Sequence, residues 1–217
     1  MSNKPIVLIT GYGVFRGYSR NPSAEAVKLV QSILTQTPDP ALAPFDIKFI
    51  PEIPVLYAEI DKLDFCRLDD TKKGKAVCNP MPTIIVNVGV SHKNGSKVHL
   101  ESRASSFGYN SPDVEGQRCA NQGQHSCSPN GEEQNQEVLE SGLDLKLCCQ
   151  QLNESVGENT AAVSIDAGRY LCEYLFYKSL KCCGKSVFVH VSQESRVSVS
   201  ETAKILMQAI RFLCAQI

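Results

Sequence analysis

The 217-residue chain lacks an excess of either charge, with 22 Lys and Arg against 23 Asp and Glu. Charges alternate in sign along the sequence, so there is no basic stripe of the kind that binds nucleic acid or an anionic membrane. No stretch approaches the ~20 apolar residues of a membrane span, and the apolar run at 5–9 is too short for a signal peptide. We therefore expect a cytoplasmic protein with no nucleic-acid or membrane partner.

The ten cysteines lack the spacing of a disulfide or zinc framework. Residues 148–149 and 182–183 are adjacent pairs, and no C-x-x-C motif is present. Without a secretory signal, such cysteines are expected to be reduced thiols. Cys119, His125 and Cys127 lie together in a polar segment, but their spacing fits no common zinc pattern. We expect neither a metal nor an organic cofactor.

Strand and helix patterns alternate along the chain. Apolar runs at 5–10, 83–90, 161–165 and 186–191 are typical of buried strands, and residues 45–50 alternate like a half-buried strand. Helices are expected from 21, capped by Asn21 or Ser23, and over 55–68, 143–152, 169–182 and 200–215. Residues 97–102 read as an extended segment leaving the sheet edge, and 107–137 as a long surface loop. The pattern predicts one domain over residues 1–217, a three-layer α/β/α sandwich with a mostly parallel central sheet.

The first helix should bury one face. Apolar side chains recur at helical spacing, which predicts that the following residues point inward: Ala26, Val27, Val30, Ile33 and Leu34.

Cys172 lies just inside a predicted helix that follows a predicted strand. The unpaired N–H groups and positive end of such a helix favour the thiolate and can hold an oxyanion near the sulfur. The alternative is a buried structural cysteine, as most free cysteines are.

His190 and Glu101 are the candidate partners of this thiol. His190 lies near the end of the next strand after Cys172, one helical crossover away, and can act as base and acid. Glu101 follows the most apolar strand and can fix the tautomer of the imidazole. His92, His99 and His125 are competing bases; His99 should share the face of Glu101 but belong to no strand adjoining the Cys172 helix.

The loop after the first strand, residues 11–17, carries two aromatic side chains, Tyr12 and Phe15. An α/β sheet normally meets its ligand at such a carboxyl edge. The two rings either line a ligand pocket or plug the core beneath the loop.

Several segments together resemble a known family. Residues 163–180 (VSIDAGRYLCEYLFYKSL) and 187–191 (VFVHV) closely resemble the corresponding segments of the pyroglutamyl-peptidase I family. Members of this family are cysteine peptidases that remove N-terminal 5-oxoproline. Residues 9–15 (ITGYGVF) are similar to the family's Thr-Gly-Phe-x-Pro-Phe signature, and 21–23, 88–91 and 100–101 match further motifs.

The resemblance implies a Cys-His-Glu triad with an acyl-enzyme: Cys172 is the nucleophile, His190 the base and acid, and Glu101 the residue that orients His190. The lactam pocket is expected at Tyr12, Phe15, Val90 and Asp113. The expected partners are small peptides with N-terminal pyroglutamate; a monomer and a homo-oligomer both remain open.

The chain departs from the family pattern at Tyr12, Val14 and Arg16, where the signature has Phe, Pro and Gly. Two alternatives follow. One is a catalytically weak relative that binds blocked N-termini, and the other is a thiol-rich interaction protein.

Overall fold

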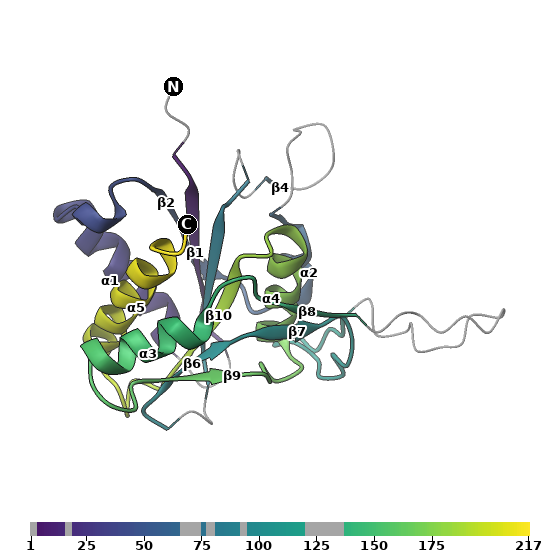
Figure 1. Ribbon diagram of the computed structural model, residues 1–217. Coiled ribbons are helices and arrows are strands. Elements are labelled where there is room, and N and C mark those ends of the chain that lie inside the picture. Colours follow the sequence, from purple (N-terminus) through teal and green to yellow (C-terminus); the bar gives the residue numbers. More distant parts are fainter. Residues whose placement is uncertain (1–3, 16–18, 66–74, 77–80, 92–94, 120–136) are drawn as a thin grey trace.

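A six-stranded sheet forms the centre of the molecule (Figure 1). The computed structural model describes residues 4–15, 19–65, 75–76, 81–91, 95–119 and 137–217. The strand order is β2-β1-β5-β10-β6-β9, and every neighbouring pair is parallel except β10 with β6. The predicted mostly parallel sheet is confirmed. The strands are β1 (Ile6–Tyr12), β2 (Asp46–Ile53), β5 (Ile84–Val90), β6 (Val98–Glu101), β9 (Ala161–Ser164) and β10 (Ser186–Val191).

Helices cover both faces of this sheet, as the alternating pattern predicted (Figure 1). One hydrophobic cluster joins the sheet to α1 (Pro22–Gln36), α3 (Leu145–Ser155) and α5 (Val199–Cys214). The second joins its other face to α2 (Tyr57–Lys62) and α4 (Leu171–Cys182). Successive strand residues point to opposite faces, so Val189 lies in the first cluster and Phe188 in the second.

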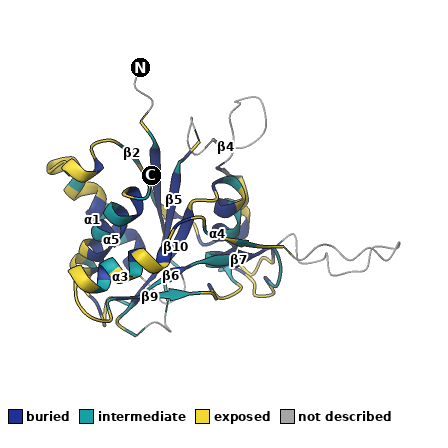
Figure 2. Ribbon diagram, viewed as in Figure 1, coloured by how far each residue is buried: buried dark blue, intermediate teal, exposed yellow. Residues whose placement is uncertain are grey.

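Strand β5, an apolar run, lies inside the sheet between β1 and β10 and is almost wholly buried (Figure 2). Its only side chain with hydrogen-bonding groups, Asn87, is fully buried and accepts a hydrogen bond from Thr10 at 2.9 Å while donating to Ser179 at 3.0 Å. A buried amide is tolerated when its donors and acceptors are paired. Because both faces of β5 are covered, its continuous apolar run follows from its position.

Helix α1 begins where its capping signal predicts. The Asn21 side chain accepts the backbone N–H of Ser23 at 3.0 Å, and Pro22 takes the first helical position. Ile33 was expected to point inward, but it is 37% exposed because it lies on the flank of the helix. The other expected inward residues are buried or partly buried against the core: Ala26, Val27, Val30 and Leu34.

The helix expected over 55–68 is shorter than predicted. Helix α2 ends at Lys62, because Leu63 takes an extended conformation (φ −76°, ψ 111°) and begins β3 (Leu63–Asp64). This strand pairs with β4 (Lys75–Ala76) in a separate two-stranded sheet. A second small sheet pairs β7 (Arg103–Ser105) with β8 (Val138–Glu140), and η1 (Pro40–Leu42) is a single 3₁₀ turn.

The segment expected to leave the sheet edge is instead an interior strand. Strand β6 lies between β10 and β9 and runs antiparallel to β10. Strands β9 and β10 are therefore not neighbours, contrary to expectation, although the single helix α4 connects them as expected. The pairing with β9 and β10 covers both edges of β6, which its alternating sequence did not reveal.

Four residues considered from the sequence, Arg16, His92, His125 and Cys127, lie outside the described residues. Within the described ranges, no helix combines the length and hydrophobicity required to cross a bilayer.

Candidate active site

Cys172 is the second residue of α4, close behind strand β9, as predicted. Its side chain is partly buried. Strand β5 passes next to the sulfur at Gly89, where an added Cβ would lie 3.3 Å from Cys172 Sγ and 2.6 Å from Phe188 Cζ. Only glycine leaves that space open. The first N–H groups of a helix have no partner within the helix, so the thiol lies at the positive end of α4.

The turn before Cys172 is held by a buried carboxylate. Arg169 has a positive φ of 46°, and its backbone N–H donates to Glu173 Oε2 at 2.8 Å. The Arg169 guanidinium forms an ion pair with Glu173 and lies over the Phe107 ring, 5.4 Å from its centroid. Glu173 also accepts the N–H of Ser105 at 2.9 Å. These contacts fix the entry into α4; the sequence motif contained both residues without indicating this contact.

His190 lies on β10 and is only 6% exposed. Its Nδ1 lies 2.7 Å from Glu101 Oε1. Burial alone would lower the pKa of His190, but hydrogen bonds to Cys172 and Glu101, and the charges of both groups, raise that pKa to about 9. The structure therefore brings the three expected residues into contact in the order thiol, imidazole, carboxylate.

The register of β6 against β10 explains this contact. Glu101 lies opposite Phe188, and His99 lies opposite His190. Residues two apart on a strand share a face, so all four side chains lie on the α4 side of the sheet. Diagonal neighbours across two strands can touch when their side chains are long, which is how Glu101 reaches His190. His99 shares the face of Glu101 as expected, but its strand does adjoin β9, contrary to expectation.

A cavity of about 250 Å³ opens beside the thiol. Its lining is almost wholly apolar and consists of Tyr12, Phe15, Asn21, Val55, Val90, Tyr170, Leu171 and Cys172. This volume is below that of a typical drug-sized site, so the cavity suits a small group.

The polar side chains of the lining are mostly turned to internal partners. The Tyr12 hydroxyl donates to the Leu171 carbonyl at 2.6 Å, and Tyr170 donates to the Pro112 carbonyl at 3.3 Å. The Asn21 side chain donates to the Gly13 carbonyl at 2.8 Å. Burial raises the pKa of Tyr12 well above its ordinary value, so its hydroxyl stays protonated and its ring presents an apolar wall.

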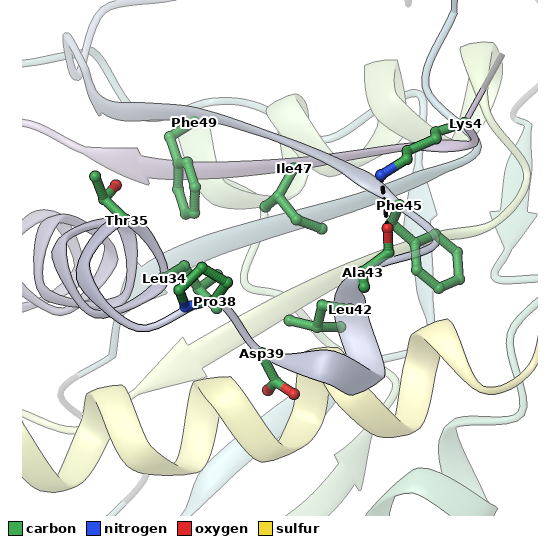
Figure 3. Close-up of a pocket in the computed structure, with 10 residues that line it drawn as sticks. All are labelled: Lys4, Leu34, Thr35, Pro38, Asp39, Leu42, Ala43, Phe45, Ile47 and Phe49. Carbon is green, nitrogen blue, oxygen red and sulfur yellow. Dashed lines mark hydrogen bonds between the residues drawn. The ribbon is translucent and has the colours of Figure 1, made fainter. Parts of the chain in front are cut away.

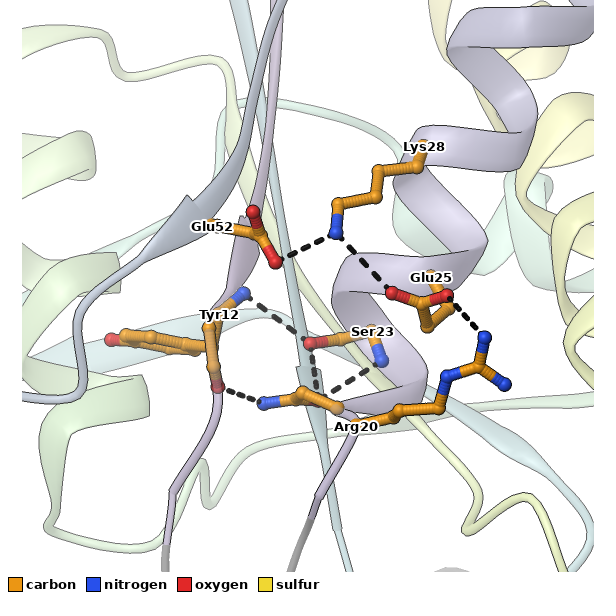
Figure 4. Close-up of polar contacts among 8 residues, drawn as sticks. Tyr12, Arg20, Ser23, Glu25, Lys28 and Glu52 are labelled. Carbon is orange, nitrogen blue, oxygen red and sulfur yellow. Dashed lines mark hydrogen bonds and ion pairs between the residues drawn. The ribbon is translucent and has the colours of Figure 1, made fainter.

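The end of β1 is further anchored to α1 (Figure 4). The Tyr12 backbone N–H donates to Ser23 Oγ at 3.3 Å. Next to this contact, Lys28 bridges Glu52 of β2 and Glu25 of α1, with Nζ–Oε1 distances of 2.6 and 3.3 Å. These contacts hold Tyr12, which lines the cavity, against α1.

Of the four residues assigned to the pocket from sequence, Tyr12, Phe15 and Val90 line the cavity. Asp113 does not. Its carboxylate accepts backbone N–H groups from Tyr57 at 3.2 Å, Glu115 at 3.0 Å and Gln117 at 2.9 Å. Asp113 thus organises its own loop against the start of α2. The pocket residues Asn21, Val55 and Tyr170 were not assigned from sequence, because nothing local marks them as neighbours of the thiol.

A larger cavity of about 390 Å³ lies at the β2 edge of the sheet (Figure 3). Lys4 donates to the Ala43 carbonyl at 2.8 Å across it, and Asp39 forms an ion pair with Arg211. Its lining contains no cysteine or histidine. Among the residues that the structure describes, no cluster of His, Cys, Asp and Glu could hold a metal ion. The candidate active site is therefore the cavity beside Cys172.

A thiol, an imidazole and a carboxylate in contact at one end of an α/β sheet form the arrangement that thiol acyl transfer requires. No family model matches the sequence. Curated relatives named pyroglutamyl-peptidase 1, from Homo sapiens and Rattus norvegicus, are each 28% identical over 190 residues, covering 85% of this chain and 78% of theirs. The resemblance inferred from the sequence motifs is confirmed.

Solved structures share the fold over nearly the whole chain. Pyroglutamyl peptidase I from Bacillus amyloliquefaciens superposes with a TM-score of 0.67 at 23% identity, covering 97% of this chain and 95% of that one. A mutant pyrrolidone carboxyl peptidase from Pyrococcus furiosus gives 0.68 at 22% identity, covering 97% and 99%. These structures confirm the α/β fold.

Proposed function

We propose that this chain is a cysteine exopeptidase that removes N-terminal 5-oxoproline from peptides. The observation that carries the proposal is the contact of His190 with both Cys172 and Glu101 beside a small apolar cavity. The similarity to pyroglutamyl-peptidase 1 supports the same substrate class. The sequence lacks the cysteine spacing of a disulfide framework, and reduced thiols suit the cytoplasm; we propose that the enzyme acts there.

Acylation begins with His190 taking the proton of Cys172. The thiolate attacks the carbonyl that joins 5-oxoproline to the next residue, and the N-terminal N–H groups of α4 stabilise the oxyanion. Glu101 accepts the Nδ1–H of His190, which leaves Nε2 to exchange protons with the sulfur. The raised pKa of His190 favours the imidazolium that forms.

The same imidazole then assists both the formation and the hydrolysis of the acyl-enzyme. His190 gives its proton to the departing amine, so the C–N bond breaks and the acyl group remains on Cys172 as a thioester. A water molecule loses a proton to His190 and attacks the thioester. Release of 5-oxoproline returns the proton to the sulfur. No cofactor takes part in this sequence.

Selectivity arises from the cavity beside the sulfur. Tyr12 and Phe15 offer ring surfaces, and the Tyr12 and Tyr170 hydroxyls already have acceptors. A flat uncharged lactam ring fits such an apolar cavity. A charged N-terminal amine would lose its hydration without gaining a partner, which is costly.

The direct test is Cys172→Ala with a pyroglutamyl fluorogenic substrate. We expect cleavage to vanish while the circular dichroism spectrum is unchanged. Cys182→Ala, at the far end of the same helix, is the matched control and should retain turnover. Substantial turnover by Cys172→Ala would refute the assignment. Binding of pyroglutamyl peptides without turnover by the unmodified chain would identify a non-catalytic relative instead.

A further inference from the structure

One oxygen of the Glu101 carboxylate has no hydrogen-bond donor. Glu101 is 1% exposed, and its Oε1 contacts His190. Its Oε2 is buried and has no partner among the residues that the structure describes. Buried carboxylate oxygens normally have partners, because an unpaired one loses its hydration without compensation.

His99 shares a strand and a face with Glu101. It is two residues before Glu101 on β6 and directly opposite His190 on β10, so the three side chains share one face. Glu101 itself lies opposite Phe188. To reach His190, its carboxylate leans diagonally toward the pair formed by His99 and His190. This displacement moves the carboxylate toward His99, and the charge of Glu101 acts on the His99 imidazole.

The His99 imidazole has the chemistry to serve as the missing donor. It is partly exposed, so its ring has room to turn. Burial lowers the pKa of His99; Glu101 raises it, and His190 and Lys97 lower it. Glu101 lies on β6, Lys97 immediately precedes β6 and His190 lies on β10, while Ala162, opposite on β9, carries no charge. A neutral imidazole at pH 7 still has one N–H to donate.

We propose that His99 is a second imidazole partner of Glu101, donating a ring N–H to Oε2 after a change of side-chain rotamer. His99 is then a positioning residue: it holds the carboxylate so that Oε1 faces His190 Nδ1. Nothing in the sequence motifs assigned His99 this role. The proposal rests on the proposed function of the same site, but its first test needs no substrate.

The first test follows the pKa of His99 by NMR titration in the Cys172→Ala protein. Removing the charge of Glu101 (Glu101→Gln) should lower the pKa of His99 by about one pH unit, in both low and high salt, because a buried hydrogen-bonded pair is poorly screened. Lys97→Gln, the matched control immediately before the same strand, should raise the pKa of His99 in low salt only. An unchanged pKa in Glu101→Gln, or a decrease that high salt abolishes, overturns the proposal.

The second test separates positioning from packing. With a pyroglutamyl substrate, His99→Leu should lower kcat about tenfold with KM unchanged, and His99→Gln, which keeps an N–H donor, should restore most of it. Equal losses in both variants overturn the proposal. If the unmodified chain cleaves no pyroglutamyl substrate, the proposed function fails, and the titration alone decides the role of His99.

Discussion

Replacing Glu101 by Gln removes one negative charge from a buried hydrogen bond and changes little else. The bond joins Glu101 Oε1 to His190 Nδ1 at 2.7 Å, and both side chains are buried. Hydrogen bonds to charged groups contribute about 1.5–3 kcal/mol. At about 1.4 kcal/mol for each factor of ten, kcat should fall about 10- to 150-fold.

The loss becomes larger if the amide reverses the tautomer of His190. A Gln side chain can donate its NH₂ to Nδ1, which moves the imidazole proton to Nε2, where it can no longer accept the thiol proton. The corresponding Asp→Asn change in a serine protease triad lowers kcat by about 10⁴. Glu101 does not line the cavity, so KM should stay within about twofold. The pKa of His190 should fall, because Glu101 raises it.

The assay is steady-state cleavage of a pyroglutamyl fluorogenic substrate, with kcat and KM measured across the pH range. Glu154→Gln on the exposed side of α3 is the matched control, since its carboxylate bonds only with a neighbouring glutamine in the described part of the chain. Unchanged kcat and KM in Glu101→Gln would remove Glu101 from the active site. A rise in KM with kcat intact would instead make it a binding residue.

Three further predictions follow from burial and packing. Iodoacetamide should alkylate Cys172 before Cys148, because burial raises the pKa of Cys148 to about 12; peptide mass spectrometry reads the order. Since the folded pKa of His190 is raised to about 9, its contribution to stability is full below its ordinary value of 6.5 and is lost as pH rises to about 9, so the unfolding free energy should fall by about 2–4 kcal/mol over that window. Gly89→Ala should destabilise the fold by about 1–3 kcal/mol in urea unfolding, because its Cβ would lie 2.6 Å from the Phe188 ring.

Each of these has a control. Prior alkylation of Cys148 would favour a thiol-rich interaction protein over a peptidase. His190→Gln should flatten the pH dependence of stability, and an identical dependence in that variant would contradict the cause given. Gly184→Ala, where an added Cβ meets nothing within 4 Å, should leave stability nearly unchanged.

Local patterns predicted much of the fold because their causes are local. The runs that became β5 and β10 are apolar because both of their faces are covered. Asn21 caps α1 through a bond to a residue two positions away. The thiol at the start of α4 follows from the same kind of reasoning, since a strand, a turn and a helix lie in order along the chain.

The predictions that were wrong depended on contacts made in the tertiary structure rather than on near neighbours in the sequence. Asp113 was assigned to the pocket from a motif, but its oxygens bond Tyr57, 56 residues away in sequence, and two N–H groups of its own loop. Helix α2 stops early because Leu63 pairs with Lys75 of β4. Such pairings depend on tertiary neighbours, and no periodicity in the sequence reports them.

By itself, the sequence determined which chemical groups are present, which runs must be buried and which helix end carries the thiol, because these depend on residue type and near neighbours. Only the tertiary structure decided that β6 lies antiparallel between β10 and β9. That placement sets Glu101 diagonal to His190 and His99 opposite it. Glu101 and His190 are 89 residues apart in the sequence, and the register of their strands is settled by packing across the whole sheet. The sequence could therefore identify the three residues of the site but not how their side chains meet.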